Sequence, residues 1–325
     1  MNLNQSKILI VRLSSFGDIV LTFSLIDFLK KEFRDTELHF LTNSEYESLL
    51  KENRLIDKIL IFQNSISKTR KMISREKYDI IFDLHKNFKS ILSTTCTEAK
   101  TLRYKKENLK KFLLVNFKIN LFRNITPVYL KYFKILGKTD IKSEYKFTTT
   151  KLVENERAEL KENHILIAPS SKHYTKRYPA KKFNLIIKKL NKHKIVLTGD
   201  KSVTDNKICN FLKQENPEVE NLCGKTDFKA LIELVTSSKL VITNDNGVMH
   251  LAEALGRKII AIFGSSVEEF GFYPQLETSS ILEIKELKCR PCSHIGRQNC
   301  PKKHFECMEK IEPVEIIKLI EEKLN

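Results

Sequence analysis

A carboxylate that follows a buried strand is the first residue of this sequence that could do chemistry. Asp18 comes after the apolar run Lys7–Leu13 and the small-residue loop Ser14-Ser15-Phe16-Gly17, where a helix is predicted to begin. A carboxylate within hydrogen-bond reach of a hydroxyl group can remove its proton, so Asp18 could act as a general base. It could equally be an N-cap that accepts hydrogen bonds from the helix it opens.

A second polar cluster lies in the last third of the chain. The apolar run 239–243 predicts a buried strand, and a turn separates it from a helix predicted over 248–255. Four polar or small residues lie at this junction: Asp245, Asn246, Gly247 and His250. Ligands bind at the carboxyl ends of parallel strands beside helix N-termini, so this junction is a candidate ligand site. The structural alternative is that Asp245 caps the helix, Gly247 relieves backbone strain and His250 packs.

Alternating strand and helix patterns surround both clusters and must position them. Short apolar runs bounded by polar loops predict strands, and the intervening segments have helical periodicity. This rhythm is typical of parallel sheets, so an α/β protein is predicted. A single helix is expected from Asp18 to about Lys31. Strands are expected at 7–13, 37–41, 58–62, 80–84, 164–168, 195–198, 239–243 and 258–263.

The chain of 325 residues is long enough for two ordinary domains. A polar stretch without periodicity at about 138–163 predicts the linker between them. We therefore expect domains at 1–150 and 151–312. Pro313 favours the start of a closing helix over 313–325.

The net charge of +17 indicates an anionic partner, which could be nucleic acid, an anionic membrane surface or a phosphorylated ligand. The segment 100–151 carries fourteen Lys or Arg but three Asp or Glu, and aromatic and aliphatic residues are interleaved with them. This segment could dock on an anionic membrane or an acidic acceptor, or it could be a solvated helical face. None of the common nucleic-acid-binding patterns is present. Without a signal peptide or a stretch of ~20 apolar residues, the protein is expected in the cytoplasm.

Four of the seven cysteines crowd into the tail, with a histidine among them. Cys289, Cys292, Cys300 and Cys307 have spacings that can hold tetrahedral zinc, and His304 lies between the last two. In a reducing compartment, free thiols or a metal are favoured over disulfides. The sequence leaves both alternatives open.

Three of these motifs, in this order, resemble glycosyltransferase family 9, the heptosyltransferases, whose fold is GT-B. They are the segment Arg12–Val20 (RLSSFGDIV), the segment Asp245–His250 and the cysteine-rich tail. Many family members carry such a tail with no metal assigned. Asn246 stands where the family usually has Thr or Ser. The family's Lys-x-Trp-Pro element is matched by Lys176–Pro179, with Tyr in place of Trp.

The resemblance implies roles for individual residues. Asp18 would be the catalytic base, and Lys176 would stabilise the charge that grows on the leaving nucleotide diphosphate. The donor-binding residues would be Ser170, Lys176, Asp245, Asn246, Gly247 and His250. The acceptor-binding residues would be Ser14, Ser15, Gly17, Asp83 and His85. Asp83 and His85 match an Asp-x-His element of the family, but they could equally form a strand-end turn.

The resemblance further implies two doubly wound Rossmann-like domains with a cleft between them. The first would bind the acceptor, the second would bind the donor, and the closing helix would pack back on the first. The expected reaction is inverting, metal-independent transfer of heptose from ADP-heptose to a lipopolysaccharide inner-core acceptor, either Kdo or heptose on lipid A. The alternatives are a transferase for another nucleotide sugar and a basic nucleic-acid-binding protein. We expect a monomer, peripheral on the cytoplasmic face of the inner membrane.

Overall fold

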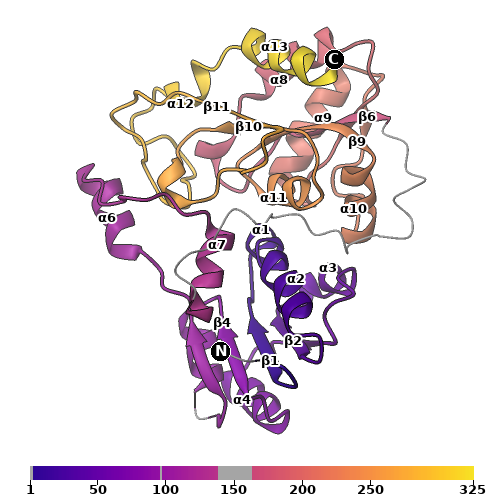
Figure 1. Ribbon diagram of the computed structural model, residues 1–325. Coiled ribbons are helices and arrows are strands. Elements are labelled where there is room, and N and C mark those ends of the chain that lie inside the picture. The colour runs from indigo at the N-terminus through magenta and orange to yellow at the C-terminus, as the bar shows by residue number, and fades with distance from the viewer. Residues whose placement is uncertain (1–2, 96, 138–162) are drawn as a thin grey trace. The chain divides into compact units, whose positions relative to one another are not determined.

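The computed structural model describes residues 3–95, 97–137 and 163–325, which form two compact units (Figure 1). Unit 1 comprises Met1–Lys106 and Val128–Asn155. Unit 2 comprises Glu107–Pro127 and Glu156–Asn325.

The division differs from the predicted one in one segment. Glu107–Pro127 belongs to unit 2, although the sequence predicts one continuous domain over 1–150. The predicted boundary at residue 150 lies outside the described residues, as does almost all of the predicted linker at 138–163.

A five-stranded parallel sheet forms the centre of unit 1. Its order is β3-β2-β1-β4-β5. The strands are β1 (Lys7–Val11), β2 (Glu37–Thr42), β3 (Lys58–Ile61), β4 (Ile80–Asp83) and β5 (Lys100–Arg103). The first four agree with the predicted strands to within two residues. The fifth is an edge strand of sequence KTLR that is partly exposed, so it has no apolar run by which it could be predicted.

The helices of unit 1 lie between these strands in the chain, except α7, which follows β5. They are α1 (Phe16–Val20), α2 (Phe23–Glu32), α3 (Glu47–Lys51), α4 (Ile66–Arg75), α5 (Phe88–Thr94) and α7 (Val128–Phe133). The predicted single helix from Asp18 to Lys31 is therefore wrong, because the helix is interrupted between the end of α1 and the start of α2. At the interruption, the Thr22 backbone N–H bonds to the Ile19 carbonyl, three residues back, at 2.9 Å, and the Thr22 hydroxyl donates to the same carbonyl at 2.7 Å.

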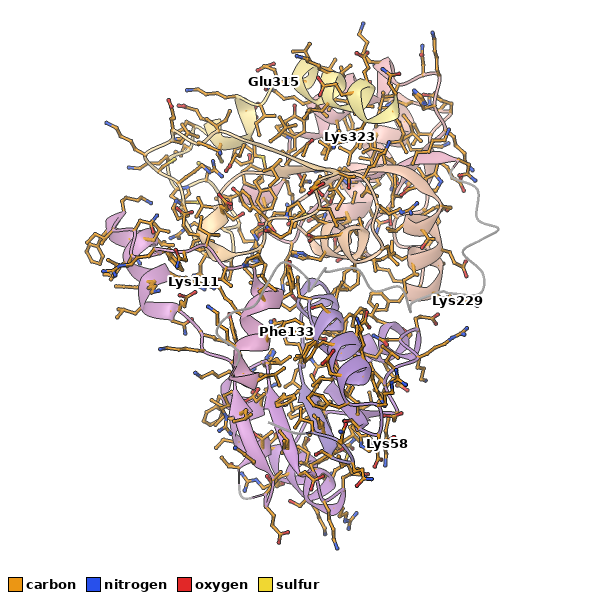
Figure 2. The ribbon with its side chains drawn as sticks, viewed as in Figure 1. Lys58, Lys111, Phe133, Lys229, Glu315 and Lys323 are labelled. Carbon is orange, nitrogen blue, oxygen red and sulfur yellow. The ribbon has the colours of Figure 1, made fainter. Side chains whose placement is uncertain are left out.

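Apolar side chains from both faces of this sheet make the core of unit 1. Leu9, Leu41 and Ile81 are fully buried on neighbouring strands. Phe133, labelled in Figure 2, packs edge-on against Phe28 with ring centroids 5.3 Å apart. Burial of each such side chain stabilises the folded state by about 1.5–3 kcal/mol, so the sheet is stable enough to hold the loops at its edge in place.

Unit 2 repeats the same plan with one more strand. Its parallel sheet has the order β11-β10-β9-β6-β7-β8. The strands are β6 (His164–Ala168), β7 (Ile195–Leu197), β8 (Glu220–Asn221), β9 (Ser238–Asn244), β10 (Ile259–Phe263) and β11 (Ser279–Glu283).

Polar caps fix where several helices of unit 2 begin. The side chains of Ser202, Asp227 and Asn246 each accept a hydrogen bond from the backbone of the helix that follows. The helices are α6 (Asn108–Phe117), α8 (Ala180–Lys189), α9 (Val203–Glu215), α10 (Phe228–Thr236), α11 (Gly247–Ala254), α12 (Glu306–Glu309) and α13 (Pro313–Leu324). Among the described residues, none of the helices could span a bilayer.

The closing helix α13 packs within unit 2, and the expectation that it packs on the N-terminal domain stays a prediction. Ile316 and Ile320 are fully buried in the same core as Phe183 and Ile187 of α8. Tyr178 donates to the carbonyl of Ile311 at 2.9 Å, just before this helix. The apolar face of α13 is therefore used inside unit 2.

In each sheet, the direction in which successive strands are added reverses once. In unit 1 the reversal lies between β1 and β4, and in unit 2 between β6 and β9. At such a switch point the connections leave in opposite directions, and ligands bind outside the carboxyl ends of the two strands. The predicted site residues follow these four strands.

Candidate active-site residues

Asp18 lies at the switch point of unit 1 in the first turn of α1. Its Oδ2 accepts a hydrogen bond from the Ser15 hydroxyl at 2.8 Å and forms an ion pair with Nη2 of Arg12 at 2.8 Å. The side chain is 22% exposed, so a substrate hydroxyl can reach it. The N-cap of α1 is Ser15, so the alternative that Asp18 is the N-cap is wrong; as the third residue of α1, Asp18 instead accepts from the Ser15 backbone N–H at 3.4 Å in a capping box. The role of Asp18 as a base stays a prediction.

Arg12 is a site residue that the sequence analysis missed. It follows β1 directly and is buried, so its charge needs several partners. Its guanidinium donates to the carbonyls of Ser14 and Leu84, both at 2.7 Å, and to the Tyr132 hydroxyl at 3.2 Å. It thereby joins the loops after β1 and β4. The available signal was a charged residue that interrupts an apolar run.

Asp83 is the last residue of β4, His85 lies two residues further on, and the two have different surroundings. Asp83 is fully buried, and its carboxylate accepts from the backbone N–H groups of His85 and Lys86 at 3.1 and 2.7 Å. It also accepts from the Ser90 hydroxyl at 3.1 Å. The strand-end turn is therefore present, and Asp83 holds the loop in shape.

His85 is placed beside the Asp18 loop. It shares a hydrogen bond with the backbone of Ser14. Burial, with Arg12 and Lys106 nearby, lowers the pKa of its imidazole to about 4, so the ring is neutral at pH 7. Its Nδ1 is buried and has no hydrogen-bond partner among the described residues. Together with Arg12, His85 makes the surroundings of Asp18 polar and preorganised.

Lys176 and Asp245 form a buried ion pair at the switch point of unit 2. Nζ of Lys176 lies 2.7 Å from Oδ2 of Asp245, and the side chains are 13% and 6% exposed. The Ser266 hydroxyl donates to the same oxygen at 2.5 Å. Burial opposes ionisation of Asp245, but Lys176 and Ser266 outweigh it and lower the pKa of the carboxyl below its usual value. The sequence predicted both charged residues, but it did not predict their contact.

Asn246 caps α11 and ties it to the loop after β6. Its Oδ1 accepts from the Met249 backbone N–H at 3.2 Å and from the Thr243 hydroxyl at 3.0 Å. Its Nδ2 donates to the Ser170 carbonyl at 2.8 Å. An amide can therefore take the place of the family's hydroxyl at this position, because its oxygen performs the cap.

The remaining predicted donor residues surround this junction. Gly247 is the first residue of α11, and His250 lies one turn further on, 5% exposed, with its ring 6.0 Å from that of Phe272. The Ser170 hydroxyl donates to Asp205 at 2.5 Å, and Ser170 is 4% exposed. Ser170 therefore contributes to the site through its backbone and its bond to Asp205.

The loop that carries Lys176 is held from two further segments that the sequence analysis did not connect with it. The Thr175 hydroxyl accepts from the Arg297 backbone N–H and from the Ser265 hydroxyl, both at 2.9 Å. Tyr174 stacks on Phe305 with ring centroids 4.6 Å apart. The cysteine-rich tail therefore supports the Lys176 loop directly.

The four tail cysteines line a small cavity of about 20 Å³ together with Thr175 and His304. All four carry free thiols, and Sγ of Cys289 lies 3.8 Å from Nε2 of His304. Burial raises the pKa of the Cys307 thiol to about 12. Within the described ranges, no three His, Cys, Asp or Glu side chains are arranged to hold a metal ion. The zinc hypothesis and the expected metal independence both stay predictions.

Two parallel-sheet units of this kind, each with its polar residues at the switch point, define the chain as an α/β protein of the GT-B class. A family model described as glycosyltransferase family 9 (heptosyltransferase) matches residues 66–303. Because this match covers most of the chain, the protein belongs to glycosyltransferase family 9 and is a glycosyltransferase.

Individual relatives agree with the family match. Lipopolysaccharide heptosyltransferase 1 of Campylobacter coli is 28% identical over 97% of this chain and 98% of its own length. The solved structure of E. coli heptosyltransferase WaaC with ADP-2-deoxy-2-fluoro heptose has a TM-score of 0.72 at 15% identity, covering 97% and 99% of the two chains. An iron-containing dodecameric glycosyltransferase, TibC from enterotoxigenic E. coli H10407, has a TM-score of 0.59 at 12% identity over 99% and 76%. At these identities, the structures support the fold alone.

Proposed function

We propose that this protein transfers heptose from ADP-heptose to an inner-core sugar of lipopolysaccharide, with inversion at the anomeric carbon. The observation that carries the proposal is the family match, combined with Asp18 and Lys176 at the two switch points. The name of the Campylobacter coli relative supports the acceptor class, and the ligand in the WaaC structure supports the donor.

In the proposed reaction, the carboxylate of Asp18 takes the proton of an acceptor hydroxyl. The hydroxyl oxygen forms a bond to the anomeric carbon of the heptose, and the bond from that carbon to the diphosphate breaks. Arg12 holds the Asp18 carboxylate in place, because their ion pair is short and largely shielded from water. Ser14, Ser15, Gly17 and neutral His85 would surround the acceptor, with Asp83 acting through the loop it holds.

At the donor, Lys176 would stabilise the charge that develops on the leaving ADP. Asp245 would act by holding the ammonium group in position, and the N-terminus of α11 at Gly247 would add backbone N–H groups and a favourable dipole. His250 and Asn246 would complete the donor site. We propose that these fixed groups replace a metal ion, although the neighbour TibC is iron-containing.

The partners follow from this chemistry. The proposed acceptor is lipid-linked, so we propose that the protein works at the cytoplasmic face of the inner membrane. We also propose that it is a monomer. A transferase for another nucleotide sugar is the alternative, since Asn246 departs from the family pattern.

The decisive experiment supplies purified protein with ADP-heptose and a Kdo-bearing acceptor, and follows the product by mass spectrometry. We expect an acceptor mass increased by one heptose, in the presence or absence of EDTA. A panel of other nucleotide sugars tests the alternative. Turnover with a different sugar but not with ADP-heptose would contradict the donor assignment, and loss of turnover in EDTA would contradict metal independence.

The Asp18→Asn variant separates catalysis from capping. As the base, Asp18 should lower kcat by about 10²–10⁴-fold when its charge is removed. Because Asn caps a helix about as well as Asp, a purely capping residue should leave kcat nearly unchanged in this variant. Asp227→Asn is the matched control, because Asp227 caps α10 through the Ala230 backbone N–H. Rates equal to the native enzyme in Asp18→Asn would remove this residue from the mechanism.

A further inference from the structure

Exposed apolar side chains are concentrated on one short segment of unit 2. The structure exposes twelve large hydrophobic side chains among the described residues, and half of them lie between residues 109 and 125. These six are Leu109, Phe112, Phe117, Ile119, Leu121 and Ile125, with 44–70% of each exposed. We call this set the α6 face. Single exposed apolar residues are ordinary, but their concentration on one short segment, where the ring centroids of Phe112 and Phe117 lie 5.9 Å apart, indicates an interaction surface.

The orientation of α6 explains why its apolar side is exposed. Leu114 is buried on the opposite side of the helix, and Nζ of Lys111 lies 5.9 Å from the ring centroids of Phe270 and Phe272. Nζ of Lys118 donates to the Pro291 carbonyl at 2.7 Å. Figure 1 shows α6 and Figure 2 labels Lys111 beside it. Two of the helix's cations are therefore directed at the body of unit 2, and Leu109 and Phe112 are left outside.

Charge favours a lipid surface as the partner of the α6 face. The segment Glu107–Pro127 carries four cations and one acidic residue, Glu107. Lys111 and Lys118 are engaged by the rest of unit 2, which leaves Lys110 and Arg123 as the outward cations of the segment. That acid is already paired with Lys110 at 2.9 Å. The whole chain carries +17, and anionic headgroups attract such a protein before apolar side chains enter the acyl region.

The dimensions also fit a lipid surface. With ten residues, α6 is about 15 Å long, which is too short to cross a bilayer but suits a helix lying in the interface. Phe and aliphatic side chains with flanking Lys and Arg are the composition of such interfacial helices.

We propose that the α6 face inserts into the interface of an anionic phospholipid membrane and anchors unit 2 there. This proposal deepens the proposed function, because it names the membrane-contacting residues of an enzyme whose acceptor is lipid-linked. Binding to vesicles requires neither donor nor turnover, so it can fail or succeed independently of the heptose-transfer proposal.

The absence of tryptophan from the sequence allows a direct test. Phe112→Trp places a single indole on the α6 face, and Leu185→Trp places one on α8, at a position with the same 54% exposure. With vesicles of phosphatidylcholine and phosphatidylglycerol, we expect the emission of Phe112→Trp to shift to the blue and to be quenched by lipids brominated in the acyl chain. The indole of Leu185→Trp should show neither effect. Equal behaviour of the two variants would overturn the proposal.

A second pair of variants measures the contribution to binding. Leu109→Ser/Phe112→Ser/Phe117→Ser should weaken sedimentation with these vesicles at least tenfold, and should leave turnover of a delipidated acceptor unchanged. Leu185→Ser/Val203→Ser/Val314→Ser removes three comparably exposed apolar groups from α8, α9 and α13 and should bind as the native protein does. Native-level binding by the first triple variant would refute the inference. So would a native dimer that ignores vesicles and dissociates in that variant, because the α6 face would then contact a second copy.

Discussion

Replacing Lys176 by Met would remove one member of the buried ion pair and test the donor site most sharply. Asp245 would keep the Ser266 hydroxyl but lose the ammonium group at 2.7 Å, while its side chain remains 6% exposed. Removing one partner of a buried pair typically costs about 3–5 kcal/mol, because the other charge stays buried without compensation. Asp245→Asn should cost a similar amount for the opposite reason.

The double variant Lys176→Met/Asp245→Asn leaves neither charge behind. We therefore expect it to be less destabilised than the sum of the single variants by about 2 kcal/mol, within the range seen for residues in contact. Urea unfolding of the four proteins measures this coupling free energy. The pair Lys188–Glu215 is the control, since its side chains are 52% and 43% exposed and its coupling should be below about 0.5 kcal/mol.

The same variants also report on catalysis. If Lys176 stabilises the leaving diphosphate, Lys176→Met should lower kcat by about 10²–10³-fold even under conditions where the protein is folded. Additive stability changes, within about 0.5 kcal/mol, would refute the argument that the pair is coupled. Unchanged kcat in Lys176→Met would refute its role at the leaving group.

Two further predictions concern buried titratable groups. The imidazole of His85 has a pKa of about 4 in the folded protein and ~6.5 in the unfolded chain. As the pH drops, the unfolded state therefore binds the proton first, and the free energy of unfolding should fall between about pH 6.5 and pH 4. His85→Gln should lessen this fall by up to about 3 kcal/mol, and an unchanged pH profile of urea unfolding would contradict it. Burial raises the pKa of the Glu253 carboxyl to about 8. Its tendency to ionise should therefore lower the free energy of unfolding as the pH rises from about 4.3 to 8. Glu253→Gln should then stabilise the protein by on the order of 3 kcal/mol at pH 8 and little at pH 4, and a gain equal at both values would count against this reasoning.

The sequence predicted the central strands well because they are continuous apolar runs that parallel sheets require. The strand β6 was predicted residue for residue, and β1, β9 and β10 to within two residues. The edge strand β5 and the break at Thr22 were missed for local reasons. A half-exposed strand has no distinctive pattern, and a hydroxyl that bonds to its own helix leaves no trace in hydrophobic periodicity.

The roles of the predicted site residues stay predictions, but the structure shows contacts of these residues that the sequence did not predict. Motifs located Asp18, Lys176 and Asp245, yet the ion pairs of Asp18 with Arg12 and of Lys176 with Asp245 depend on where separate loops meet. Hydrophobic patterns report only which face of an element is buried, so they carry no information about such pairs. The hydrogen bonds that Arg297 and Ser265 donate to Thr175 could not be predicted for the same reason.

The packing of α13 has a consequence for how the protein must be made. Ile316 and Ile320 complete the core that also contains Phe183, and Tyr178 beside the Lys176 loop bonds to Ile311. On the ribosome, unit 2 therefore cannot close its core until translation has passed Ile320 and these residues have left the exit tunnel. A premature stop codon shortly before α13 would release a chain with an intact set of site residues but an incomplete core to hold them.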